Sequence, residues 1–168
     1  MDKNGDNGPM YQPLNHLAYL FPPDYSHLSY EVATRAVMKW RNTELAHILY
    51  ERDGLCWMPD CDGDRFRSDM HEAIRRSHVV GFRPKTNRLT IFNGYNTVLL
   101  CSRCHGTVRE PAPEEIISFA ADLYGKAHVL AWLESLPFTR TRNPLQWWIE
   151  ENTVDGIGRV DSWTAVQE

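Results

Sequence analysis

Cys56-Trp-Met-Pro-Asp-Cys61 and Cys101-Ser-Arg-Cys104-His105 decide the fold of this chain, because these two segments contain all four of its cysteines. Two close cysteine pairs that lie far apart in the sequence are typical of a tetrahedral metal site. Each pair presents two thiolates, and the ion closes the loop between them. Unrelated buried thiols would have no reason to occur in such pairs. The sequence therefore predicts a structural Zn²⁺ site with four ligands: Cys56, Cys61, Cys101 and Cys104.

Charge is unevenly distributed along the chain. The formal net charge is -4, yet residues 65–109 contain nine Lys or Arg and only two Asp or Glu. The segments on either side, 1–64 and 110–168, are acidic. A solvated loop is the commoner explanation of a charge run, but such a segment also attracts phosphate groups whatever the whole-chain pI. Its two acids, Asp69 and Glu72, lie beside His71, which favours a role for this segment in nucleic-acid binding.

Length and composition predict one packed domain with extensions. The chain has 168 residues, of which 42% are hydrophobic. It shows no apolar run long enough to cross a membrane and no signal peptide, so we expect a cytoplasmic protein with no membrane contact. Cytoplasmic thiols stay reduced, which favours metal binding over disulfides. We expect an irregular lead-in over 1–29, a core over 30–110 and a helical C-terminal extension with its tail over 111–168.

Apolar spacing predicts an α+β fold with helices on both sides of a small sheet. Helical periodicity covers residues 29–51, 113–125 and 126–136. One helix or two fit the first of these segments, and Asn42-Thr43 is the candidate break or cap between two. Strands are expected over 66–74, 88–92 and 96–100. A short helix is expected to begin near Cys104 and to end before Pro111.

The combination of motifs resembles the zinc-stapled branch of the HNH endonucleases, and most of all its small phage and prophage members. The resemblance covers roughly residues 40–110. The residues that carry it are Cys56-x4-Cys61, Met70-His71-Glu72 and Asn96-x4-Cys101-x2-Cys104-His105.

This resemblance implies a ββα-metal finger, in which two strands and a helix surround one divalent ion. It implies a hydrolase that cuts DNA phosphodiester bonds and leaves 5′-phosphate and 3′-hydroxyl ends. The catalytic ion would be Mg²⁺ or another divalent ion such as Mn²⁺ or Ni²⁺, and the setting would be a bacterial or phage-infected host cell.

The resemblance also implies roles for individual residues. His105 matches the last motif histidine, which binds the catalytic ion. Asn96 matches the motif asparagine, which orients the loop and base or approaches the metal. In one register His71 is a metal ligand and Glu72 the general base.

A second register makes His71 the general base. Met70 then occupies the usual ligand position, and Asp69 or Glu72 helps to hold the ion. In both registers we expect His71 and Glu72 to be essential. Phosphate contacts are expected from the basic residues of the insert, which are Arg75, Arg76, Arg83, Lys85 and Arg88.

Two other functions fit the same sequence. Met70 in front of His71 suits a zinc-stapled DNA-binding module without catalysis. The acidic C-terminal extension and the pair Trp147-Trp148 suit a protein-interaction or assembly factor that binds a protein partner. Loss of cleavage with retained DNA binding in His71→Ala would distinguish a nuclease from a pure binder.

Overall fold

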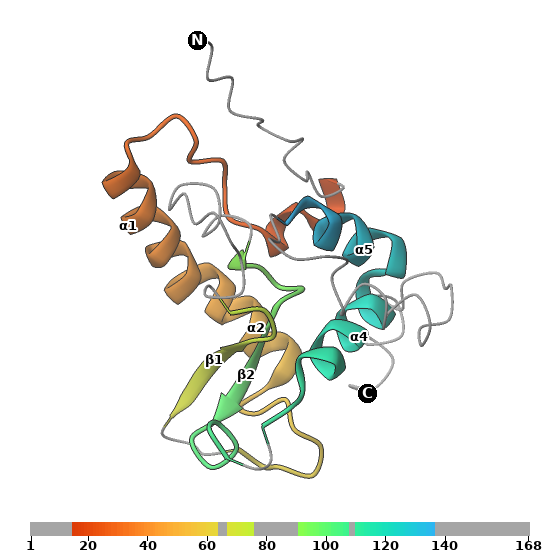
Figure 1. The fold of residues 1–168 in the computed structure, drawn as a ribbon. Helices are drawn as coiled ribbons and strands as arrows, with labels where there is room; N and C mark the ends of the chain where they lie inside the picture. The colour runs from red at the N-terminus through yellow and green to blue at the C-terminus, as the bar shows by residue number, and fades with distance from the viewer. Residues whose placement is uncertain (1–14, 64–66, 76–90, 108–109, 137–168) are drawn as a thin grey trace.

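The computed structural model describes residues 15–63, 67–75, 91–107 and 110–136 (Figure 1). Helices and one small two-stranded sheet make up the described part, so the predicted α+β class is confirmed. No helix in these ranges has the length and hydrophobicity that crossing a bilayer requires. The elements in chain order are η1 (Asn15–Leu20), α1 (Tyr30–Trp40), η2 (Arg41–Leu45), α2 (Ala46–Asp53), β1 (Ser68–Glu72), β2 (Thr97–Cys101), α4 (Pro113–Tyr124) and α5 (Lys126–Ser135).

Helices α1 and α2 run end to end because the segment η2 between them is a π-helical turn (Figure 1). Of the two alternatives for this segment, the one with a break or cap at Asn42-Thr43 is therefore wrong. A π-helical turn contains one more residue than an α-helical turn. The buried residues Trp40 and Leu45 are five positions apart, and the extra residue of this turn lets both side chains face the core. The buried residues of α1, η2 and α2 are Ala33, Val37, Trp40, Leu45 and Leu49.

Strands β1 and β2 form an antiparallel pair, in which His71 lies opposite Val98 and Glu72 lies opposite Thr97. β1 lies inside the predicted segment 66–74 and is two residues shorter at each end, and β2 is shifted by one residue from the predicted 96–100. β2 is buried along its whole length, whereas His71 is the one buried residue of β1. β2 thus lies inside the core of the described part, and β1 lies between β2 and the surface.

Arg52 and Asp53, at the end of α2, connect that helix to β2. The Arg52 guanidinium bonds the Asp53 carboxylate, with Nε–Oδ1 2.5 Å, and also donates to the carbonyls of Gly94 and Thr97 at 2.7 and 2.6 Å. The backbone N–H of Leu99 donates to Asp53 at 2.9 Å. Burial alone would lower the pKa of Arg52, but its contacts with Asp53 and Tyr124 together outweigh burial and raise it. This ion pair fixes β2 against the helix that precedes the first cysteine.

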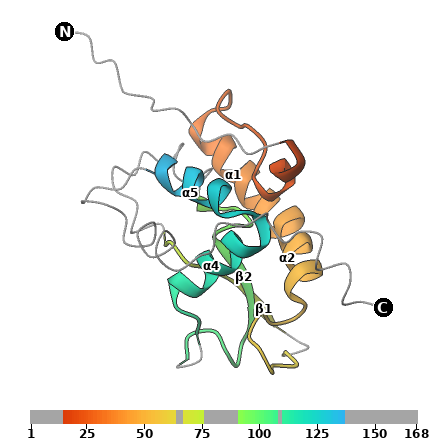
Figure 2. The same ribbon diagram turned by 90° about the vertical axis from the view of Figure 1, so that its right-hand side faces the viewer.

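Helix α4 lies on the other side of β2 from α2 (Figure 2). Pro113 opens α4, and the backbone N–H of Ala112 donates to the Glu115 carboxylate at 2.7 Å. Gly125 ends the helix with a φ of 99°, a conformation that favours glycine. The helices predicted over 113–125 and 126–136 are therefore confirmed.

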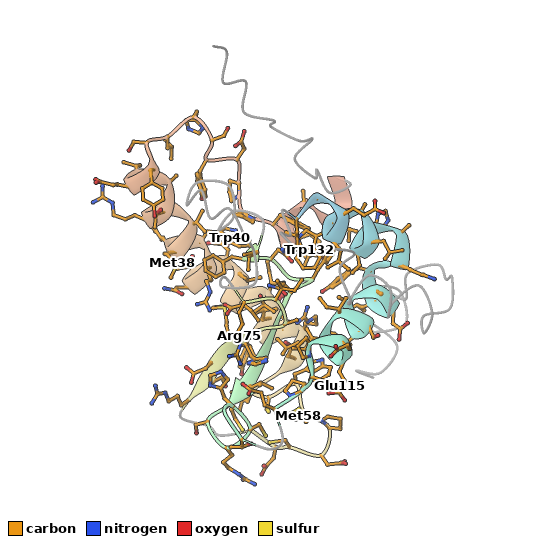
Figure 3. All side chains as sticks on the ribbon, in the orientation of Figure 1. Met38, Trp40, Met58, Arg75, Glu115 and Trp132 are labelled. Carbon is orange, nitrogen blue, oxygen red and sulfur yellow. The ribbon has the colours of Figure 1, made fainter. Side chains whose placement is uncertain are left out.

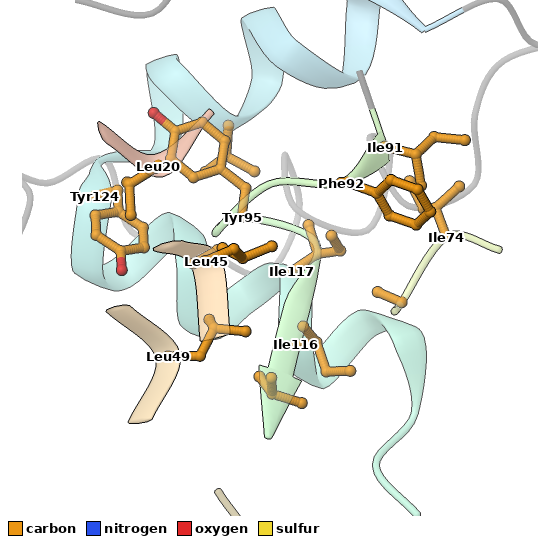
Figure 4. Packing of buried hydrophobic residues seen from close by; sticks show 14 of the residues in the cluster. Leu20, Leu45, Leu49, Ile74, Ile91, Phe92, Tyr95, Ile116, Ile117 and Tyr124 are labelled. Atoms are coloured by element: carbon orange, nitrogen blue, oxygen red, sulfur yellow. The ribbon is translucent and has the colours of Figure 1, made fainter. Parts of the chain in front are cut away.

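The buried hydrophobic residues lie around β2, between the helices α1 and α2 on one side and α4 on the other. Figure 4 shows Leu45 and Leu49 on one side of this cluster, and Ile116 and Ile117 of α4 on the other. Leu17 and Leu20 of η1 are also buried. Part of the lead-in predicted to be irregular is thus a short helix packed on the core.

Two other predictions differ from the structure. Ile91 is helical and Phe92 lies in a bend, so the described end of the strand predicted over 88–92 is wrong. Both side chains are buried, and their apolar character reflects core packing instead of strand pairing. Residues 102–106 form turns, so the short helix predicted near Cys104 is not seen in the described ranges. The tail from 137, with Trp147-Trp148, lies outside the described residues.

Candidate metal centres

The four cysteines converge although the two pairs are far apart in the sequence. The loops that carry them lie side by side below the strands in Figure 1. All four are free thiols, and their sulfurs lie within 4.8 Å of one another. Cys61 Sγ is 3.7 Å from the sulfurs of both Cys101 and Cys104. A tetrahedron with Zn–S bonds of about 2.3 Å has S–S separations of about 3.8 Å. The cluster therefore fits a metal ion such as Zn²⁺.

The turn after β2 is shaped to present thiolates. The backbone N–H groups of Cys104 and His105 both donate to the Cys101 carbonyl at 3.0 Å. Burial would raise the pKa of the Cys101 thiol, but bonds from the N–H groups of Arg103 and Cys104 and from neighbouring thiols lower it to about 7. Burial raises the pKa of Cys104 to about 12. A thiol with so high a pKa stays protonated at neutral pH by itself. A bound cation would favour its thiolate form.

Hydrogen bonds attach the first cysteine loop to both strands. The N–H of Trp57 donates to the Leu99 carbonyl of β2 at 2.8 Å, and the Ser68 hydroxyl of β1 donates to the Leu55 carbonyl at 2.7 Å. The Trp57 ring also packs edge-on against Phe119 of α4, with 5.4 Å between centroids. The four-cysteine cluster therefore lies at a junction of α4, β1 and β2.

A second cluster combines two histidines and a carboxylate. His71 comes from β1, His105 from the turn after β2, and Glu110 from the segment before α4. One ligand atom from each lies within 4.8 Å of the others. His71 Nδ1 is 2.9 Å from Glu110 Oε1, and His105 Nε2 is 3.8 Å from the same oxygen. The two imidazole rings meet edge to face, with 5.5 Å between centroids.

Strand alternation decides which acids join this cluster. Successive side chains of a strand point to opposite faces. Asp69 shares the face of His71, and its Oδ2 is 4.0 Å from His105 Nδ1. Glu72 points the other way and bonds Arg41, with Nη2–Oε1 2.6 Å. The structure therefore brings His71 and His105 together and places the Glu72 carboxylate outside their cluster.

The surroundings of His71 keep its imidazole neutral. Burial lowers the pKa of His71, the charges of Glu110 and Glu72 oppose this effect, and His105 and Arg75 lower the pKa further. A neutral imidazole is the form that binds a metal ion or accepts a proton.

Asn96 is buried and bonds the backbone on both sides of the site. Its Oδ1 accepts from the N–H of Ile74 at 2.8 Å, and its Nδ2 donates to the carbonyls of Ile74 and Ile91 at 3.0 and 3.1 Å. The Asn96 carbonyl accepts from the N–H of Ala73 at 2.9 Å. Asn96 thus holds the chain that leaves β1 in place, and its side chain is occupied with backbone groups.

The basic residues predicted to contact phosphate are described only in part. Arg75, labelled in Figure 3, is exposed, and its charge acts on His71. Arg76, Arg83, Lys85 and Arg88 lie outside the described residues.

Glu110 is the site residue that sequence reasoning missed. It directly follows the basic segment 65–109 and is the last residue of the predicted core, five residues after His105. The sequence signal was an acid close to a candidate metal ligand and directly before Pro111. Its carboxylate also accepts from the N–H of Gly106 at 3.4 Å, so the turn after β2 folds back onto it.

Comparisons with known proteins gave no match to a family model, to a curated protein or to a solved structure. The chemistry of the donor atoms indicates what the second cluster can do. Two imidazoles and one carboxylate form a set that binds Zn²⁺ and other transition-metal ions and leaves coordination positions open for water or substrate.

Proposed function

We propose that this chain is a metal-dependent DNA endonuclease of the HNH type. The observation that carries the proposal is the convergence of His71, His105 and Glu110 beside the four-cysteine cluster. The cysteines would hold a structural Zn²⁺. The second cluster would hold the catalytic ion, which is Mg²⁺, Mn²⁺ or Ni²⁺. Strands β1 and β2 would be the strands of a ββα-metal finger, with the turns at 102–106 in place of the first part of its helix.

The chemistry of phosphodiester hydrolysis suits this arrangement. A divalent ion supplies positive charge where the transition state gathers negative charge on phosphate oxygens. The attacking water must also lose a proton, and a neutral imidazole accepts one at near-neutral pH without a large pKa shift. A cluster with two histidines can supply one imidazole to bind the ion and another to accept the proton of the water.

His71 has two roles that its geometry supports. As a ligand, it joins His105 and Glu110 around the ion. As a general base, it is oriented by Glu110, whose carboxylate accepts the Nδ1–H at 2.9 Å and leaves Nε2 free to take a proton. The metal affinity of His71→Ala separates these roles, because only loss of a ligand weakens binding of the ion.

The roles of the other predicted residues follow from their contacts. We propose Glu110, in place of Glu72, as the carboxylate of the site, because Arg41 already binds the Glu72 oxygen. Asn96 would orient the chain that leaves β1, which corresponds to the loop-orienting part of one role expected for it. Exposed arginines next to the site, Arg67, Arg75 and Arg103, would contact phosphates.

A plasmid-nicking assay tests the proposal. Zinc-loaded protein is treated with EDTA under conditions that retain zinc, and Mg²⁺, Mn²⁺ or Ni²⁺ is then added back. We expect cleavage to return with at least one ion and to be absent in His105→Ala. His47→Ala is the matched control, since His47 is exposed on α2 and belongs to neither cluster.

Two results would favour the other functions. DNA binding at low salt without cleavage under any ion would indicate a binding module. No DNA affinity at low salt, together with salt-insensitive association with a protein, would indicate an interaction factor.

A further inference from the structure

Arg41 and Glu72 form an ion pair on the face of β1 opposite His71. Arg41 Nη2 lies 2.6 Å from Glu72 Oε1, and both side chains are about one-fifth exposed. The Arg41 guanidinium also stacks over the ring of Phe92, 5.0 Å from its centroid. Phe92 is buried, so the arginine is held between the core and the strand. The contact connects the junction of α1 and α2 with the residue that follows His71.

The backbone around Arg41 is adapted to this contact. Arg41 is the first residue of the π-helical turn η2, and such turns are frequently found at functional sites. The extra residue in this turn keeps Trp40 and Leu45 in the core while Arg41 reaches β1. The hydroxyl of Thr43 donates to the Lys39 carbonyl at 2.9 Å, a bond that accompanies local distortion of helices.

Holding Glu72 constrains His71. A two-stranded ribbon is marginally stable by itself and needs packing against other elements. In the described ranges β1 pairs only with β2. Neighbouring side chains of a strand point in opposite directions, so a fixed Glu72 on one face sets the direction of the imidazole on the other. Asn96 then holds the next residues, Ala73 and Ile74.

We infer that Arg41 is a positioning residue for the cluster of His71, His105 and Glu110, and that it acts through Glu72. This inference rests on the proposed function, because it requires that the cluster binds a divalent ion. In this arrangement Glu72 transmits the orientation of the helical junction to β1. Its carboxylate is engaged by a guanidinium on the far face, so it does not take the proton of the attacking water.

Co²⁺ titration of zinc-loaded protein tests this role, with the absorption bands of Co²⁺ reporting affinity and geometry at the second cluster. We expect Arg41→Met and Glu72→Gln each to weaken Co²⁺ binding by about tenfold and to change the bands. The double variant is expected to lose little more than either single one, since both remove the same contact. Arg41→Lys should restore part of the affinity. Glu51→Gln, an acid-to-amide change at an exposed site on α2, is the matched control and should bind as the unaltered protein does.

Thermal unfolding and zinc content are measured on the same samples. A contact that only stabilises the fold would lower the melting temperature and leave the affinity and bands of folded protein unchanged, which would overturn the inference. If the unaltered protein binds Co²⁺ and the variants bind within about twofold of it, only the positioning role fails. If the unaltered protein binds no Co²⁺ beyond the cysteine site, the proposed function fails as well.

Discussion

His71 is buried beside His105 and Glu110, and burial lowers the pKa of its imidazole, which favours the neutral form. We expect His71→Ala to lower the rate of DNA cleavage by about 10²–10⁴-fold, the usual contribution of a general acid or base. DNA binding in a low-salt gel shift should be unchanged, because the basic residues remain. Cleavage at the normal rate in this variant, with His47→Ala as the control, would exclude His71 from the reaction.

Glu110 contacts both imidazoles of the cluster through one carboxylate oxygen. Glu110→Gln preserves the shape of the side chain and removes its charge. We expect this variant to bind Mn²⁺ about tenfold more weakly in calorimetry, since anionic oxygen is the ligand that Mn²⁺ prefers. Zinc content should stay the same. Unchanged Mn²⁺ affinity would show that the carboxylate has no part in the site.

Individual residues show where sequence reasoning succeeds and where it fails. The spacing of the cysteines was sufficient to predict that the four thiols converge, because two close pairs far apart in a chain are typical of one metal site. The pairing of Glu72 with Arg41 was not predictable. Arg41 is 31 positions away along the chain, and the sequence does not distinguish it from the other arginines as a partner for Glu72. Glu110 was missed because a turn, and not a repeating pattern, brings it to His71.

At the scale of elements, the ion pair of Arg52 and Asp53 connects α2 to β2. Their side chains are 7% and 0% exposed, so removing one charge leaves the other buried without compensation. We expect Asp53→Asn to reduce the free energy of unfolding by about 3–5 kcal/mol in urea denaturation.

The control for this change is Glu51→Gln, two residues earlier on the exposed side of the same helix. Its effect should stay within about 0.5 kcal/mol. A loss of less than about 1 kcal/mol in Asp53→Asn would mean that the pair does not connect the helix to the sheet.

Helices were predicted better than the connections between them. Apolar residues of α4 and α5 repeat at a helical period over long segments, and Pro113 and Gly125 mark their ends. The π-helical turn after Trp40 shifts the period by one residue, which reads from the sequence as a break. Ile91 and Phe92 resemble a strand, but tertiary packing uses them in the core.

At the scale of the whole molecule, the four-cysteine cluster connects the loop after α2, the end of β2 and the approach to α4. We expect removal of its ion by a strong chelator to unfold much of the chain. Structural zinc binding contributes on the order of 10 kcal/mol of folding free energy in small zinc domains. Near-ultraviolet circular dichroism and thermal unfolding measure this effect.

His105→Ala provides the comparison, because it removes the second site and leaves all four thiols. This variant should retain zinc and nearly the same melting temperature. Chelated protein that unfolds at the same temperature as zinc-loaded protein would contradict a structural role for the cysteine cluster.

The distribution of charge along the chain can be read from the sequence without the structure. It located the basic segment 65–109, and the structure places His71, Arg75 and His105 from this segment together. The sequence did not predict that Glu110, the first acid after the basic segment, belongs to the site, because a sum of charges over segments ignores the fold.

Anomalous scattering from crystals soaked in Mn²⁺ tests whether the chain holds two metal ions. We expect two metal peaks in each molecule. One lies among the four cysteine sulfurs, and the other lies about 2.0–2.2 Å from donor atoms of the second cluster, which are those of His105 and Glu110 with or without His71. Protein that cleaves DNA with Mn²⁺ while this second position stays empty, or that binds the ion elsewhere, would contradict this expectation.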